Sequence, residues 1–143
     1  MMELEALQAV WPQLRAMGAS LVAISPQLAQ YGRAVHRRAK LEFDVLTDLH
    51  LRVAEAFGLA FTLPPDLKHL YAAFGNALDT FHDEPDFRLP MSARYVVDQD
   101  RRIRAADVNP DYTIRPESED TVAVVRQLQA ARSKAARHEG RRP

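Results

Sequence analysis

The sequence predicts an α/β fold in which a mixed β-sheet is flanked by helices, and three observations support this. The residues Leu21–Ile24 form a short continuous apolar run, which is typical of a strand buried on both faces of a parallel sheet. An amphipathic stretch follows that run directly, as in half of a βαβ unit. Two further strand-like runs within residues 93–106 are joined by a polar connection, which predicts a hairpin.

Composition places the chain among ordinary globular domains. Its 143 residues suit one domain, and the apolar fraction of 47% allows a sizeable core. The 19 basic and 19 acidic residues balance, so we expect no nucleic-acid partner. No apolar run is long enough for a membrane span, so we expect no membrane partner. Because Glu3 and Glu5 stand where a signal peptide would be basic, we expect a cytoplasmic protein.

The first predicted elements are a helix, a strand and a second helix. Pro12 lies inside the first helix and should bend it, and Gly18 should end it. The strand Ser20–Ser25 follows, and Ser25 and Pro26 are expected to begin a helix from Pro26 to Lys40. The apolar stripe of the first helix comprises Leu4, Leu7, Val10, Trp11, Leu14 and Met17, and that of the second comprises Leu28, Tyr31, Val35 and Ala39.

The middle of the chain predicts a second strand and further helices. Phe43–Leu46 is the strand, and His50–Phe57 is a helix that ends at Gly58. The apolar run Leu59–Leu63 leaves helix and strand open. Pro64–Phe74 is expected to be a helix, and Asn76–Pro90 a surface loop. The expected packing residues of the helix at 50–57 are Leu51, Val53, Ala54 and Phe57, and those of the helix at 64–74 are Leu67, Leu70, Tyr71 and Phe74.

The last part of the chain predicts a hairpin and a final helix. The strands Ala93–Val97 and Arg102–Ala106 form the hairpin, and the second alternates polar and apolar residues like an edge strand. A turn at Asn109–Tyr112 precedes a helix capped by Ser118, whose inward residues are Val122, Val125 and Leu128. We assign residues 1–131 to one incomplete domain and 132–143 to a basic C-terminal tail that frays.

This order of elements matches a thioredoxin-like layout that lacks its first strand. The sheet order we expect is Phe43–Leu46, Ser20–Ser25, a gap or a substitute strand, Ala93–Val97 and Arg102–Ala106. One neighbour of the Ser20–Ser25 strand would then not be in this chain.

Several segments together resemble the peroxiredoxin-like proteins of the alkyl hydroperoxide reductase and thiol-specific antioxidant superfamily. The resemblance runs from Met2 to about Leu128. It implies a thioredoxin-like fold and thiol-dependent reduction of hydroperoxides. The segments that carry it are Gly-Ala-Ser-Leu-Val-Ala-Ile-Ser-Pro-Gln at 18–27, Phe-Asp-Val-Leu-Thr-Asp at 43–48, Val-Ala-x-x-Phe-Gly at 53–58, Leu-Pro-Met-Ser-Ala-Arg-Tyr-Val-Val-Asp at 89–98 and Asn-Pro-Asp-Tyr-x-x-Arg-Pro-Glu at 109–117.

The chain departs from that family at its reactive centre. The family carries a Trp-Cys-Pro-x-Cys type of motif before a helix, and Glu3–Leu7 matches the continuation of that helix. The reactive cysteine would therefore lie before Met1, and the sequence contains no cysteine at all. Ser92 stands where the family places a proline that is often cis, so we expect a changed loop there.

Without the central strand, its two neighbours would face a gap with unpaired backbone groups. Each such buried group costs about 1–3 kcal/mol. Three outcomes stay open: a start codon further upstream, direct pairing of the flanking strands, or a strand supplied by a second chain. A homo-oligomer could form through the sheet edges or through the inserted helical region, whose aromatic residues are Tyr71, Phe74, Phe81 and Phe87.

No catalytic, cofactor-binding or metal-binding residue is assigned from the sequence, and we expect no cofactor. No two of the five histidines lie three or four residues apart, as two metal ligands on one helix face would. His82-Asp83-Glu84 could hold a cation weakly. Ser25 and Ser92 have no recognisable His–Asp partners. We therefore expect a peroxiredoxin-like protein whose given sequence is redox-inactive. It would act on a small hydroperoxide only if the missing segment with the reactive cysteine were restored. The alternative is a non-enzymatic interaction or oligomerisation module. The histidines are His36, His50, His69, His82 and His138.

Overall fold

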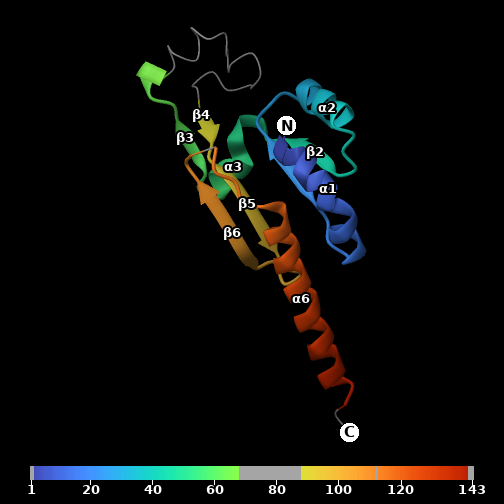
Figure 1. Ribbon diagram of the computed structural model, residues 1–143. Coiled ribbons are helices and arrows are strands. Elements are labelled where there is room, and N and C mark those ends of the chain that lie inside the picture. The colour runs from blue at the N-terminus through green and yellow to red at the C-terminus, as the bar shows by residue number, and fades with distance from the viewer. Residues whose placement is uncertain (1, 68–87, 112, 142–143) are drawn as a thin grey trace.

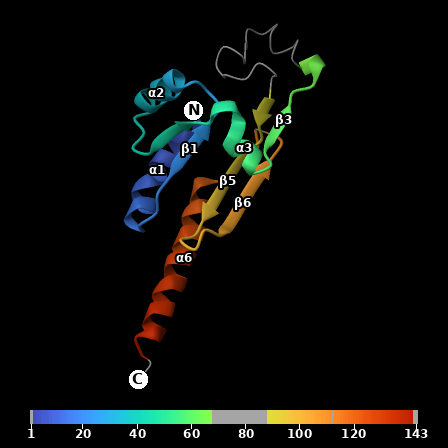
Figure 2. The same ribbon diagram turned by 180° about the vertical axis from the view of Figure 1, so that it is seen from behind.

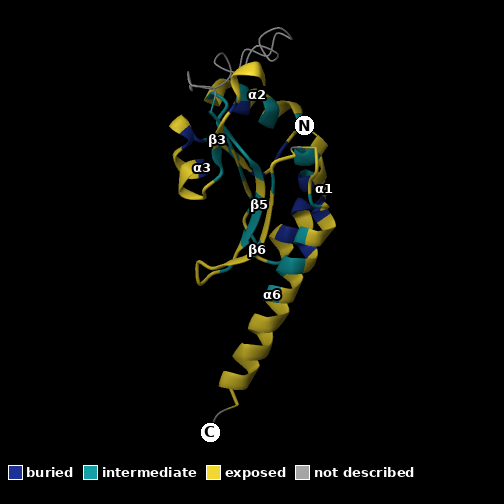
Figure 3. Ribbon diagram, turned by 90° about the vertical axis from the view of Figure 1, so that its left-hand side faces the viewer, coloured by how far each residue is buried: buried dark blue, intermediate teal, exposed yellow. Residues whose placement is uncertain are grey.

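A computed structural model describes residues 2–67, 88–111 and 113–141 of the chain (Figure 1). Helices α1 and α6 lie on one side of the strands and α3 lies on the other (Figure 3). The elements are α1 (Met2–Ala16), β1 (Val22–Ser25), α2 (Ala29–Arg38), β2 (Asp44–Thr47), the 3₁₀ helix η1 (Leu49–Leu51), α3 (Arg52–Ala56), β3 (Ala60–Thr62), β4 (Arg88–Pro90), β5 (Ser92–Val97), β6 (Ile103–Asn109) and α6 (Ser118–Glu139).

Helix α1 supplies most of the core, as its apolar stripe predicts. Trp11 meets Phe43 edge-on, with the ring centroids 6.4 Å apart. The helix ends at Ala16, and Gly18 stops its continuation with a φ of 78°, which favours glycine, while the Ala19 N–H donates to the Leu14 carbonyl at 3.0 Å. The buried cluster consists of Leu7, Val10, Trp11, Leu14, Leu41, Phe43 and Val122.

Strands β1 and β2 pair in parallel, with Ala23 opposite Val45, and α2 connects them (Figure 2). Helix α2 begins at Ala29, so the expected start at Pro26 with a Ser25 cap is wrong. The chain stays extended there because Ser25 pairs with Thr47 in the β-ladder. The Ser25 hydroxyl instead accepts the Gln27 N–H at 3.2 Å.

The expected helix at 50–57 divides into η1 and α3. His50 and Leu51 both have left-handed backbones, with φ of 57° and 54°, so one continuous helix is not formed. Leu51 is fully buried and Ala54 nearly so, as expected. Phe57 is 45% exposed but packs its ring against that of Tyr95, with centroids 4.9 Å apart, whereas Val53 is 39% exposed and is not part of the buried core.

The apolar run at 59–63, for which the sequence allowed either a helix or a strand, contains strand β3. This strand pairs antiparallel with β4. Residues Arg88–Pro90 are therefore a strand, although they were expected to end a loop. Hydrogen bonding with β3 holds them extended, since Phe61 lies opposite Leu89. The expected helix at 64–74 begins at Pro65, and its continuation, with the rest of the loop up to residue 87, lies outside the described residues.

The predicted hairpin is confirmed and is longer than expected. Strand β5 begins at Ser92 and β6 continues to Asn109. No peptide bond in the described residues is cis, so the chain passes Ser92 in trans.

Helix α6 follows the hairpin and differs from the expectation at both ends. The position before its first turn is Glu117, and Ser118 makes no capping bond. The helix continues to Glu139, so the expected fraying after Ala131 is wrong for those residues. The division into a domain and a tail stays a prediction.

Candidate functional site: a cleft between two strand pairs

The described strands form three separate two-stranded sheets, β1–β2, β3–β4 and β5–β6. The pairs β2–β1 and β5–β6 are those expected from the sequence, and direct pairing of β1 with β5 does not occur between them. Each of these two strands therefore has one edge that is not hydrogen-bonded to another described strand. The site is defined by the space between these edges.

A cleft of about 320 Å³ lies between the beginning of β1 and the end of β5. Helices α1 and α6 both contribute to its lining. Most of the side chains in that lining are apolar. Ser20 and Leu21, which precede β1, line one side, and Tyr95, Val96 and Val97 at the end of β5 line the other. The apolar lining includes Leu14 and Met17 from α1, Leu21 before β1, Tyr95 and Val96 from β5, and Val125 and Leu128 from α6.

One end of the cleft carries a carboxylate held by several donors. The Asp98 carboxylate accepts the Gln99 N–H at 2.8 Å and forms ion pairs with Arg132 and Arg104. The Gln99 amide, followed by the Arg132 and Arg104 guanidinium groups, lowers the pKa of Asp98 below its usual value of 3.8. Asp98 and Arg132 both line the cleft, so this end is polar and fixed in position.

The amino end of α1 carries a second charged group, made by one carboxylate and two arginines. Arg94 on β5 donates to the Glu3 carboxylate at 2.9 Å, and Arg115 donates to its other oxygen at 3.0 Å. Arg94 also donates to the Thr121 hydroxyl at 3.2 Å, which connects α1, β5 and α6. Only 12% of the Arg94 side chain is exposed, so this link is partly shielded from water.

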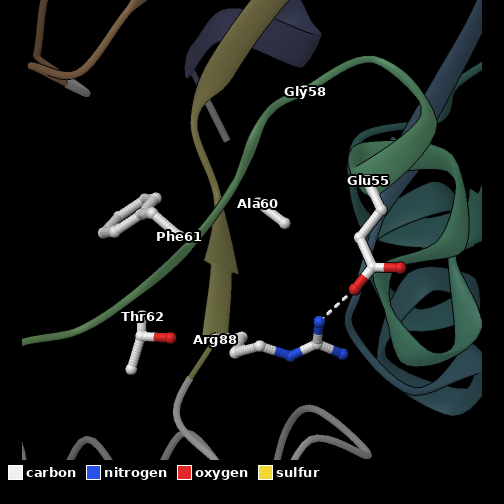
Figure 4. Close-up of a pocket in the computed structure, with 6 residues that line it drawn as sticks. All are labelled: Glu55, Gly58, Ala60, Phe61, Thr62 and Arg88. Atoms are coloured by element: carbon white, nitrogen blue, oxygen red, sulfur yellow. Dashed lines mark hydrogen bonds and ion pairs between the residues drawn. The ribbon is translucent and has the colours of Figure 1, made fainter.

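A second hollow lies beside β3 and is much more open (Figure 4). Its volume is about 310 Å³, and Arg88 on β4 reaches across it to the Glu55 carboxylate on α3. Arg88 also donates to the His50 carbonyl at 3.3 Å. The side chains of Ala60, Phe61 and Thr62 complete the lining, and none is a strong nucleophile or base. The ion pair therefore ties α3 to β4 and serves the fold.

The sequence candidates do not assemble into a catalytic group. The described part of the chain holds no cluster of three metal-ligating side chains. His69, His82 and the aromatic residues of the inserted region lie outside the described residues. Ser25 is used in a local turn, and Ser92 pairs with Asn109 in the hairpin. The Glu3, Arg94 and Arg115 group was not predicted, because 91 positions separate Glu3 from Arg94 and no sequence pattern links them.

The parallel β1–α2–β2 unit, the antiparallel β5–β6 hairpin and the covering helices α1 and α6 are consistent with an α/β protein of the thioredoxin-like class. A model of the AhpC/TSA family matches residues 1–106. The chain therefore belongs to the AhpC/TSA family. None of the curated proteins matches the sequence significantly. Within the described residues, no helix combines the length and the apolar character that crossing a bilayer requires.

Proposed function

We propose that the chain is the cysteine-free part of a peroxiredoxin-like thiol peroxidase and is redox-inactive by itself. The observation that carries this proposal is the absence of any cysteine in a chain of the AhpC/TSA family. In thiol peroxidation a thiolate attacks a peroxide oxygen, the O–O bond breaks, and a sulfenic acid and an alcohol are formed. A methionine can be oxidised but does not act as a low-pKa nucleophile, so the four methionines do not replace the thiolate.

We also propose that the catalytic strand of the complete peroxidase lies between β1 and β5, and the cleft supports this. Among the described strands, β1 and β5 each have one edge without a strand partner, and Leu14, Val125 and Leu128 of the two helices line the cleft between the start of β1 and the end of β5. The amino end of α1 lies near the carboxyl end of β1 (Figure 2). A strand parallel to β1 would therefore end where α1 begins, as a right-handed βαβ crossover requires. We further propose that the complete protein is cytoplasmic and has an antioxidant role, with a small hydroperoxide as its substrate.

Peroxide consumption by the purified chain tests this proposal. With hydrogen peroxide or a small alkyl hydroperoxide and a dithiol donor, we expect a rate no higher than that of the buffer with donor alone. The matched control is the same chain extended before Met1 by an apolar strand that ends in a Trp-Cys-Pro-x-Cys sequence, which should gain thiol-dependent peroxide reduction. Turnover by the cysteine-free chain would contradict the proposal.

A second candidate function is oligomerisation, favoured by the outer face of the β1–β2 pair. Val22, Ile24 and Leu46 are 47%, 46% and 50% exposed and lie on neighbouring strands. Contiguous apolar residues on a sheet face are typical of a protein–protein contact. A second copy of the chain would cover this face with an identical one in a two-fold dimer.

A further inference from the structure

The second half of helix α6 carries a row of positive charge on one side. Arg126, Lys134 and Arg137 are exposed on this helix, and we call them the basic stripe. At about 100° and 1.5 Å per residue, the three fall within about 80° of the helix circumference and extend over about 16 Å. Arg141, in the turn that follows the helix, is exposed as well.

The basic stripe faces away from the rest of the molecule. Val125 and Leu128 lie on the side of α6 that lines the cleft, and Arg132 on the same side pairs with Asp98. The helical period places the basic stripe on the opposite side. Residues 129–141 are all exposed, and this part of the helix extends beyond the strands (Figure 3).

The charge of the basic stripe is not neutralised within the described part of the chain. The positions three and four residues from each member hold no carboxylate, and no ion pair joins the stripe to a described acidic residue. Lys134 and Arg137 are instead like charges three residues apart, which weakens a helix. Five basic residues and one acidic residue, Glu139, lie between positions 126 and 141. A surface of this kind attracts a polyanion.

We propose that the basic stripe binds the phosphate backbone of double-stranded nucleic acid, without preference for the base sequence. Guanidinium groups pair well with phosphate oxygens. An anionic membrane fits less well, because a helix on a membrane surface needs large apolar side chains and residues 129–141 include none. An acidic protein also fits less well, since tight protein contacts typically centre on buried aromatic residues, which this segment lacks.

The expectation of no nucleic-acid partner rested on the net charge of the whole chain. Because the chain has 19 basic and 19 acidic residues, the positive excess in α6 is balanced by a negative excess elsewhere. The structure gathers the positive excess on one exposed side of a helix, and the average over the chain hides it. The proposal is independent of the proposed redox function.

Salt-dependent binding by the full chain of 143 residues tests the proposal. The probe is a fluorescein-labelled DNA duplex of mixed sequence, and its fluorescence anisotropy is measured between about 50 and 200 mM potassium chloride. Contact with three to four phosphates predicts a slope of about −3 when the logarithm of the association constant is plotted against that of the salt concentration. A slope near zero would overturn the proposal.

Removing the basic stripe should abolish most of this binding. The triple variant Arg126→Gln, Lys134→Gln, Arg137→Gln should bind at least about tenfold more weakly and show a flatter salt slope, because fewer counterions are released. Glutamine is a good helix former, so circular dichroism should show an unchanged helix content. Binding equal to that of the parent chain would contradict the assignment to this helix.

A matched control separates the basic stripe from net charge. The variant Arg33→Gln, Arg37→Gln, Arg38→Gln removes three exposed cations from α2 and should bind like the parent. Equal losses in the two triple variants would show a response to net charge alone and would overturn the proposal.

Competitors identify the kind of polyanion. An unlabelled RNA duplex should displace the DNA probe as an unlabelled DNA duplex does, because the contacts are to phosphates. Vesicles that contain phosphatidylserine, or poly-glutamate, should displace the probe poorly at the same concentration of negative charge. Failure of the RNA duplex to compete, or displacement by vesicles or poly-glutamate as effective as that by duplex, would overturn the proposal.

Discussion

At the residue scale, Asp48 shows how one buried carboxylate fixes a turn that the sequence pattern did not reveal. Its two oxygens accept the N–H groups of Val53 and Ala54, each at 2.9 Å, and only 6% of the residue is exposed. The Asp48 N–H donates to the Ser25 carbonyl at 2.9 Å, so the same residue also holds the end of β1. These hydrogen bonds, to segments before and after the turn, hold His50 and Leu51 in their left-handed backbone conformations.

We expect Asp48→Ala to lower the free energy of unfolding by about 1–3 kcal/mol, because two amides lose their acceptor in a buried turn. Asp48→Asn should lose less, since one oxygen remains as an acceptor. Urea denaturation monitored by circular dichroism measures both. Asp44→Ala is the matched control, because Asp44 is exposed, and it should change stability by less than about 0.5 kcal/mol. Equal losses at both positions would contradict the capping role.

At the element scale, Asp98 joins the β5–β6 turn to α6. Arg104 reaches it from β6 and Arg132 from α6, beyond the point where the apolar stripe of that helix ends at Leu128. The sequence did not predict this contact, since Arg132 was assigned to a fraying tail. Helix α6 continues past Ala131, and its next residue, Arg132, is the one that pairs with Asp98.

The lowered pKa of Asp98 makes this contact dependent on pH. Because the folded-state pKa lies below 3.8, the contribution to stability is fully present above that pH and is lost as the pH falls through the folded-state value. We expect Asp98→Asn to be less stable than the parent at neutral pH and to lose less stability on acidification. Thermal unfolding from neutral pH to below 3.8 measures the difference. Parallel pH profiles for the two proteins would contradict this assignment.

The pattern of correct and wrong expectations follows from what periodicity can and cannot report. The stripe of α1 and the β5–β6 hairpin were predicted because they depend on local spacing of apolar residues, whereas the β1–β2 pairing was predicted from the order of the elements. The start of α2 was wrong because pairing of Ser25 with Thr47, a non-local contact, outweighs a local capping signal. The Arg94 and Glu3 contact could not be predicted, because the two residues meet only in the folded chain.

At the scale of the whole molecule, two parts of the described chain are left uncovered. Val22, Ile24 and Leu46 on the outer face of β1–β2 are 47%, 46% and 50% exposed, and residues 131–139 of α6 are all exposed. Surface of this kind is available for contact with further polypeptide.

We expect the chain to self-associate with increasing concentration through the outer face of β1–β2. The double variant Ile24→Thr, Leu46→Thr should shift it toward the monomer, because it removes apolar area from the contact without touching the core. Sedimentation velocity over a series of protein concentrations measures the shift. Ile114→Thr is the control, since Ile114 is 54% exposed but lies outside the strands. A concentration-independent monomer would exclude the contact.

The exposed end of α6 also determines the geometry of anything attached to it. Residues from Ala131 to Glu139 are all exposed and helical, and the eight steps between them, at 1.5 Å each, extend about 12 Å (Figure 3). Because the helix is stiff, a fluorophore or an affinity group at Glu139 is held away from the cleft at a fixed distance. The helix thus provides a rigid spacer that keeps an attached group clear of the strands.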